Sequence, residues 1–110
     1  MPQYLLLLHE APKTTNLSPD AMQAIIQKYK AWSDKLKQTG RLIDANKLRR
    51  DGRVMRGVTV TDGPYPEGKE VIGGYFMIEA ADYAQAVQLG RDCPNLELGG
   101  TIEVREIESC

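Results

Sequence analysis

The stretch Tyr4-Leu5-Leu6-Leu7-Leu8 places five apolar residues in a row near the start of the chain. An apolar run of this length is typical of a buried strand. Successive side chains of a strand point to opposite faces, so Leu6 and Leu8 share one face and Leu5 and Leu7 the other. The run is far shorter than the apolar core of a signal peptide or a membrane span, and we expect neither.

Two further stretches predict helices. Ser18-Pro19-Asp20 is a typical helix start, with serine as N-cap, proline at the first helical position and an acid in the first turn. Apolar residues then recur at helical spacing until Gly40, a glycine suited to the C-terminal cap. This apolar stripe consists of Met22, Ile25, Ile26, Tyr29, Trp32 and Leu36. Asp82 opens a second predicted helix, which Pro94 stops.

Four more stretches predict strands. Leu42–Arg49 and Arg53–Thr61 flank Asp51-Gly52, a turn signal that predicts a hairpin between them. Val71–Glu79 and Thr101–Ile107 complete the set. The order is β-α-β-β-β-α-β, and without one hairpin strand it becomes βαββαβ, the ferredoxin-like split βαβ arrangement. We expect one α+β domain over residues 1–110, with both helices on one face of an antiparallel sheet.

The predicted strand Val71–Glu79 is also apolar on both faces. Its side chains divide into Ile72, Phe76 and Ile78 on one face and Val71, Tyr75 and Met77 on the other. An antiparallel sheet with one face in water alternates apolar and polar residues instead. Since two helices cover only one face, the second apolar face predicts a homodimer that packs sheet against sheet.

The composition argues against several kinds of partner and cofactor. Fourteen Lys and Arg residues against fifteen Asp and Glu give the 110-residue chain a net charge of −1, which opposes nucleic-acid and membrane-surface binding. The two cysteines, Cys93 and Cys110, are too few for a disulfide framework and lack the spacing of a zinc site. We expect reduced thiols in a cytoplasmic protein, without a metal or a cofactor.

His9, the single histidine, follows the first predicted strand. It predicts one of two roles. The first is a general base whose ring is oriented by a carboxylate, Asp44 or Asp62. The second is a strand-end side chain that makes a local hydrogen bond.

The segment Asp62–Glu70 is the densest polar stretch of the chain. Turn chemistry explains its aspartate, glycines and prolines, but it does not explain why Tyr65, Glu67, Lys69 and Glu70 crowd together. The segment predicts either the lining of a pocket or a rigid connector whose charges pair with one another or with a second subunit.

Five basic residues lie within the predicted hairpin, namely Lys47, Arg49, Arg50, Arg53 and Arg56. They indicate either a site for an anionic ligand or acidic partner, or a solvated edge hairpin. The second interpretation has a simple cause, because charged side chains on an edge strand oppose the addition of another strand.

Two motifs give the chain a family resemblance. Val60-Thr61-Asp62-Gly63-Pro64-Tyr65-Pro66-Glu67-Gly68-Lys69-Glu70, followed by Ile72-Gly73-Gly74-Tyr75-Phe76, resembles the DGPF-domain branch of the YCII-related family, with Tyr65 in place of a phenylalanine. The closing stretch Gly99-Gly100-Thr101-Ile102-Glu103-Val104-Arg105 is similar to the end of that family's pattern. The resemblance extends over the whole chain.

This resemblance implies a dimeric α+β barrel of ferredoxin-like subunits. YCII-like relatives are proposed to be small enzymes with a His–Asp pair in a cleft, and the histidine position on the first helix is occupied here by Tyr29. DGPF-type domains also resemble proteins encoded near, or fused to, extracytoplasmic-function sigma factors. That implies a regulatory partner.

The polar motif positions of the family fall on Asp62, Glu67, Lys69, Glu70 and Glu103. The resemblance implies that they bind a ligand or hold the dimer together, and it leaves both roles open.

Three functions are consistent with these observations. The first is a homodimer that binds a small polar molecule in a pocket between the sheet and the first helix, lined by Asp62–Glu70. The second is a cofactor-free enzyme with hydrolase-like or lyase-like proton transfer, in which His9 or Tyr29 moves the proton and Asp62 or Glu67 lies beside it. The third is an interaction module for a sigma-factor-linked partner.

Overall fold

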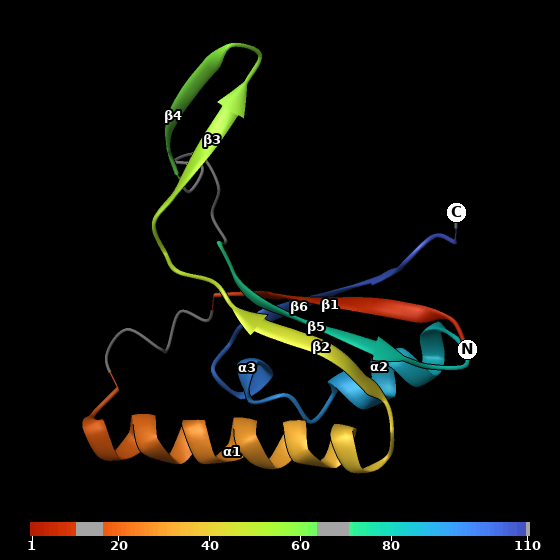
Figure 1. Ribbon diagram of the computed structural model, residues 1–110. Coiled ribbons are helices and arrows are strands. Elements are labelled where there is room, and N and C mark those ends of the chain that lie inside the picture. Colours follow the sequence, from red (N-terminus) through yellow and green to blue (C-terminus); the bar gives the residue numbers. More distant parts are fainter. Residues whose placement is uncertain (11–16, 64–70, 110) are drawn as a thin grey trace.

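The computed structural model describes residues 1–10, 17–63 and 71–109 (Figure 1). In chain order its elements are β1 (Gln3–His9), α1 (Pro19–Gln38), β2 (Leu42–Lys47), β3 (Gly52–Arg56), β4 (Thr59–Gly63), β5 (Ile72–Glu79), α2 (Tyr83–Gly90), α3 (Pro94–Glu97) and β6 (Thr101–Glu106). The result is a mixed α+β architecture, as predicted.

Helix α1 begins where the sequence indicates. The Ser18 hydroxyl accepts a hydrogen bond from the Ala21 backbone N–H at 3.1 Å, which satisfies one of the unpaired N–H groups of the first turn. The apolar stripe of the helix faces the sheet, where Trp32 and Leu36 are buried. The predicted N-cap is therefore confirmed, and the stripe is confirmed except at Ile26, whose side chain is exposed.

The main sheet has four strands in the order β2-β5-β1-β6, and every neighbouring pair is antiparallel. This order places the first and last strands side by side, as in a ferredoxin-like fold. Helices α1, α2 and α3 all lie on one side of the sheet (Figure 1). The arrangement is compatible with the predicted ferredoxin-like fold.

The predicted hairpin between Leu42–Arg49 and Arg53–Thr61 is wrong. Strand β2 pairs with β5, and β3 instead pairs with β4 around a turn at Gly57, whose φ of +62° favours glycine. The physical reason is burial, because pairing with β5 brings Leu42 against the core. The Asp51-Gly52 signal thus marks a connection between two sheets.

The predicted end of the second helix also needs correction. Helix α2 ends at Gly90, and Pro94 begins the short helix α3. Proline suits the first position of a helix, since its missing N–H has no intrahelical partner there.

The core lies between the sheet and the helices. Its members share near-complete burial and come from β1, β5, α1, α2 and the segments that follow β5 and α2: Tyr4, Leu6, Leu8, Trp32, Leu36, Ile78, Ala80, Ala86 and Cys93. The rings of Trp32 and Phe76 pack at a centroid distance of 4.5 Å. We call this side of the sheet the helix-covered face.

The opposite side of the sheet, which we call the helix-free face, is also apolar along its middle. Leu5 pairs with Met77 and Leu7 with Tyr75, so these four side chains share one face. All four are only half-buried. The two-sided apolar strands predicted from the sequence are therefore confirmed.

The β3–β4 hairpin, Gly52–Gly63, stands away from the sheet on the side opposite the helices (Figure 1). We call this hairpin the arm. It gives the chain a radius of gyration of 15.2 Å, whereas a compact chain of this length would have about 13 Å. The arm is therefore a projection from an otherwise layered body.

Candidate functional site

His9 lies at the end of β1 on the helix-free face. Its Nε2 is 3.5 Å from Glu103 Oε1 on the neighbouring strand β6, and the His9 side chain is 17% exposed. The Arg105 guanidinium donates a hydrogen bond to the second Glu103 oxygen at 3.2 Å. The strand order brings these three residues together, and Glu103 was among the candidates from sequence.

The predicted partners of His9 make other contacts. Asp44 accepts a hydrogen bond of 3.1 Å from the Tyr75 hydroxyl, which in turn accepts one of 2.8 Å from the Asn46 amide. Asp62 lies on the arm, where its carboxylate is 3.7 Å from Arg53 and its side chain is 94% exposed. The predicted pairing with His9 is therefore replaced by other contacts, because β5 lies between β2 and β1 and the arm forms a sheet of its own.

Tyr29 lies on the other side of the sheet from His9, in the layer between α1 and the helix-covered face. Its hydroxyl interacts with the Cys93 thiol and the Asn95 side chain. Burial is the main cause that raises the pKa of Tyr29. Burial also raises the pKa of the Cys93 thiol to about 11. Both groups are therefore neutral at neutral pH.

Asn95 is a site residue that sequence reasoning missed. It is 5% exposed, and its side-chain amide donates a 2.8 Å hydrogen bond to the His9 carbonyl, which joins the end of β1 to α3. Its carbonyl oxygen Oδ1 has no hydrogen-bond partner among the described residues. A Cβ at Gly100 would lie 2.0 Å from that oxygen. The Gly99-Gly100 pair was the sequence signal for this close approach.

The three catalytic candidates from sequence, His9, Tyr29 and Asp62, thus lie in three different places. They are found respectively on the helix-free face, beneath the sheet and on the arm. The candidates Tyr65, Glu67, Lys69 and Glu70 lie outside the described residues.

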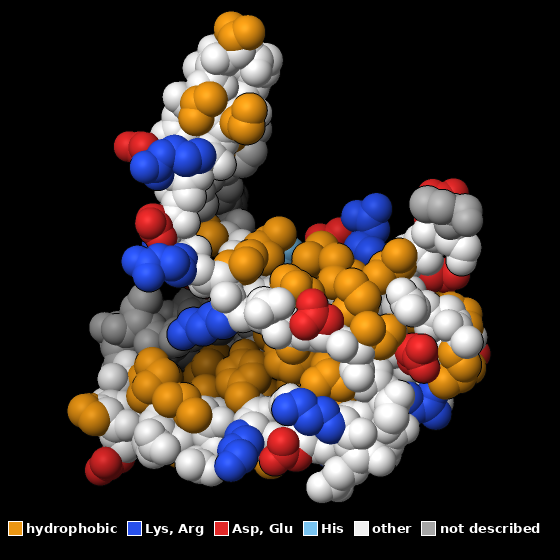
Figure 2. All heavy atoms as spheres, viewed as in Figure 1, with side chains coloured by type: hydrophobic (Ala, Val, Ile, Leu, Met, Phe, Trp, Pro, Cys, Tyr) orange, Lys and Arg blue, Asp and Glu red, His pale blue; other side chains and the backbone are white. Residues whose placement is uncertain are grey.

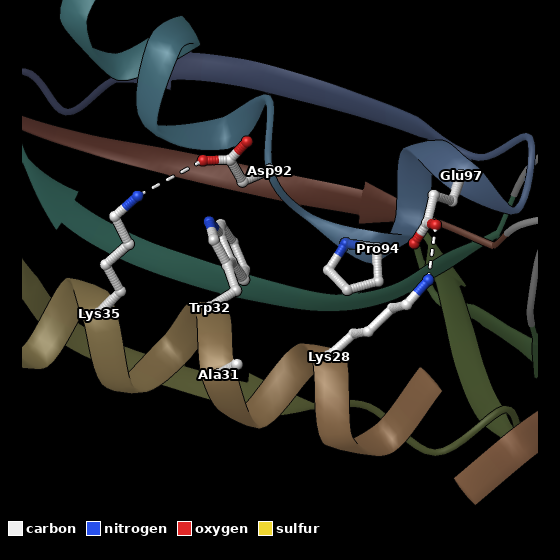
Figure 3. A pocket seen from close by; sticks show the side chains of 7 residues that line it. All are labelled: Lys28, Ala31, Trp32, Lys35, Asp92, Pro94 and Glu97. Atoms are coloured by element: carbon white, nitrogen blue, oxygen red, sulfur yellow. Dashed lines mark hydrogen bonds and ion pairs between the residues drawn. The ribbon is translucent and has the colours of Figure 1, made fainter. Parts of the chain in front are cut away.

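A surface groove of about 360 Å³ lies between α1 and residues 92–97, which include α3 (Figure 3). Trp32 and Pro94 both line it, between the two ion pairs. The Lys28 ammonium is 2.7 Å from Glu97, and the Lys35 ammonium is 3.8 Å from Asp92, so ion pairs bridge the groove on both sides of the tryptophan. Because its charged side chains already pair with one another, we interpret this groove as a packing contact that holds residues 92–97 against α1.

A second depression lies between α1 and the edge strand β2, where Figure 2 shows the molecule hollowed, with hydrophobic side chains inside. Tyr29, Leu42 and Phe76 are partly buried hydrophobic residues of this layer.

The described residues give two further results. None of their helices is long and apolar enough to cross a membrane. No group of three or more His, Cys, Asp or Glu side chains in residues 1–10, 17–63 and 71–109 is arranged to hold a metal ion.

Comparison with known proteins places the chain in a family. A comparison with curated proteins found no match. Residues 2–110 match the family model of the YCII-related domain, which agrees with the resemblance seen in the sequence motifs. The chain belongs to the YCII-related domain family.

Proposed function

We propose that the protein is a homodimer of the DGPF branch that binds a small polar molecule in the cleft between the sheet and α1. The observation that carries the proposal is a polar cluster in an otherwise apolar layer. Tyr29, Cys93 and Asn95 bring a hydroxyl, a thiol and an amide together there. Buried polar groups normally have hydrogen-bond partners, and Asn95 Oδ1 has none among the described residues.

The protonation of this cluster favours binding over proton transfer. Burial raises the pKa of both Tyr29 and Cys93, so neither is an anion at neutral pH. A general base works best when its pKa lies near the working pH, which is not the case for either group. Neutral hydroxyl, thiol and amide groups instead exchange hydrogen bonds with an uncharged polar group, such as a ligand hydroxyl or carbonyl.

The homodimer rests on the helix-free face. The strip of Leu5, Leu7, Tyr75 and Met77 has no helix above it (Figure 1). Contiguous apolar surface of this kind marks an interaction site. A second copy is the simplest cover, because the same strip on both subunits can pair about a twofold axis.

A metabolite panel screened by thermal unfolding tests the binding proposal. A ligand at 100 times its dissociation constant adds about 2.7 kcal/mol, which raises the melting temperature of a domain of this size by about 10 °C or more. We expect at least one uncharged polar metabolite to shift the wild type and to lose most of its effect on Tyr29→Phe.

Tyr75→Phe is the matched control, since it removes the same hydroxyl from the opposite face of the sheet. The control should keep the full ligand shift. A ligand that stabilises Tyr29→Phe as strongly as the wild type would place binding elsewhere and contradict the proposal.

A small cofactor-free enzyme is the second candidate function, and the contact between His9 and Glu103 favours it. A carboxylate beside a histidine orients the ring for proton transfer. In this case mass spectrometry of the metabolite panel would detect a product that His9→Gln fails to form, whereas Tyr29→Phe would still form it.

A further inference from the structure

The arm makes its sheet hydrogen bonds within itself. Its two strands, β3 and β4, form a separate two-stranded sheet with register pairs from Gly52–Gly63 to Arg56–Thr59. Figure 1 shows it rising from the side of the molecule that bears the helix-free face. An isolated two-stranded hairpin is only marginally stable in water, so an arm of this kind calls for a surface to pack against.

The apolar residues of the arm lie near its tip. Met55 and Val60 are cross-strand partners on one face of the hairpin and are 75% and 54% exposed. Val58, which follows Gly57 in the turn, is fully exposed at 102%. Arg53 and Asp62 form an ion pair on the same face nearer the base. The exposed large hydrophobic side chains of the arm therefore gather toward its tip.

The position of these side chains restricts what can cover them. The arm and the apolar strip of the helix-free face lie on the same side of the molecule. A body placed on the helix-free face would therefore lie beside the arm as well. The arm and the face then belong to one continuous interface.

The charge distribution favours a second copy as that body. Residues 47–63, which comprise the arm and the segment leading to it, contain five basic and two acidic residues. The remaining residues contain nine basic and thirteen acidic ones. The arm and the segment leading to it are thus basic together, mainly through residues 47–51, whereas the rest of the chain is acidic. Complementary charges guide association and fix its orientation.

We propose that the arm reaches across to a second copy of the chain, where the tip residues Met55, Val58 and Val60 pack against the partner's body. Two arms are exchanged about the twofold axis, so each copy covers the other's exposed hydrophobic tip. This inference rests on the proposed homodimer and adds the element that holds it together.

Photo-cross-linking between isotopically distinct copies tests the exchange. A photoreactive benzoylphenylalanine replaces Val58, whose full exposure makes the substitution compatible with folding. The variant is prepared in ¹⁴N and ¹⁵N forms, which are unfolded, mixed in equal amounts, refolded together and irradiated. We expect cross-linked peptides in which a light residue 58 is joined to a heavy partner. The same group at Val87 on α2, an exposed residue of the helix side, should give no such peptide.

The outcomes separate this inference from the homodimer itself. Light-to-heavy peptides from residue 58 support the exchange. A sample of dimeric mass whose residue 58 cross-links only within its own copy, or not at all, overturns the exchange and leaves the homodimer standing. A monomeric mass overturns both.

A second variant tests the energetic role of the tip. Met55→Asp places a charge on a side chain that is exposed in one copy, so it should leave the folding of that copy unchanged. We expect the dimer dissociation constant, measured by sedimentation, to rise at least 100-fold, whereas Val87→Asp should change it less than threefold. Equal dissociation constants for Met55→Asp and the wild type would contradict the proposal.

Discussion

The two faces of the main sheet differ in how completely one chain covers them. On the helix-covered face, Leu6 and Ile78 are 0% exposed, because α1, α2 and α3 close over them. On the helix-free face, Leu5 and Leu7 remain half-buried, although they are neighbours of Leu6 in the same strand. One chain therefore completes one core and leaves a second apolar surface half-exposed.

This difference distinguishes residues that stabilise a single copy from residues available for association between copies. The helix-covered core stabilises each copy whatever the protein concentration. In the homodimer that we propose, the helix-free face and the arm add a contribution that grows with concentration. Substitutions on the two faces should therefore behave differently, even between adjacent residues of β1.

The largest effect is expected for Leu6→Ala. Removing a fully buried leucine leaves a cavity and should lower the free energy of unfolding by about 3 kcal/mol. Urea denaturation at several protein concentrations measures it, and the loss should be the same at each. Leu7→Ala is the matched control and should cost less than about 1 kcal/mol in dilute solution, with a loss that grows with concentration. Equal losses at all concentrations would contradict the distinction between the two faces.

A smaller effect is expected for Gly100→Ala, which places a methyl group 2.0 Å from the Asn95 side-chain oxygen. Overpacking of this kind should cost about 1–3 kcal/mol. All the nearest atoms belong to Asn95, so the double variant Gly100→Ala with Asn95→Ala should lose less than the sum of the single variants. Additive losses in chemical denaturation would show that the clash is not with Asn95.

The next smaller effect compares two aspartates, one below the sheet and one on the arm. The Asp82 carboxylate accepts a 2.8 Å hydrogen bond from the Gln85 backbone N–H and caps α2, so Asp82→Ala should cost about 1 kcal/mol. The Asp62 carboxylate makes an exposed ion pair, so Asp62→Ala should change the unfolding free energy of one copy by less than about 0.5 kcal/mol. The reverse order in thermal unfolding would contradict this ranking.

The smallest effect concerns alkaline pH. The folded-state pKa of Cys93 is raised to about 11, whereas the unfolded thiol ionises near pH 8.5–9. Its contribution to stability is therefore full below about pH 8.5 and is lost as the pH rises toward 11, with a loss on the order of a few tenths of a kcal/mol at pH 9. The decrease in unfolding free energy between pH 8 and pH 9 should be smaller in Cys93→Ala. An identical decrease would contradict the raised pKa.

Most of the fold could be predicted from local patterns. The Ser18 cap, the apolar stripe of α1 and the two-sided strands all follow from spacing along the chain. The hairpin prediction failed because β2 has a choice of partners, and only the folded sheet shows that β5 buries Leu42 better than β3 does. Pairing between distant strands depends on burial that a local turn signal does not encode.

The candidate site was harder to predict because it depends on which face each residue occupies. His9, Tyr29 and Asp62 were grouped by residue type, and the fold distributes them over two faces and the arm. Glu103 was named from the motif, but its position beside His9 follows from the pairing of β1 with β6. Asn95 has no sequence pattern of its own. Its hydrogen bond to the His9 carbonyl spans 86 positions of the chain, and its close approach to Gly100 crosses the end of α3.

Sedimentation equilibrium of the wild-type chain is the decisive test of the proposed homodimer. We expect the protein at about 10 μM to have twice the 12.3 kDa mass of one chain. We also expect the dimeric mass to decline toward that of one chain in Met55→Asp and not in Val87→Asp. A wild-type mass of 12.3 kDa at this concentration would mean that the helix-free face and the arm have no partner copy, and the homodimer would be wrong.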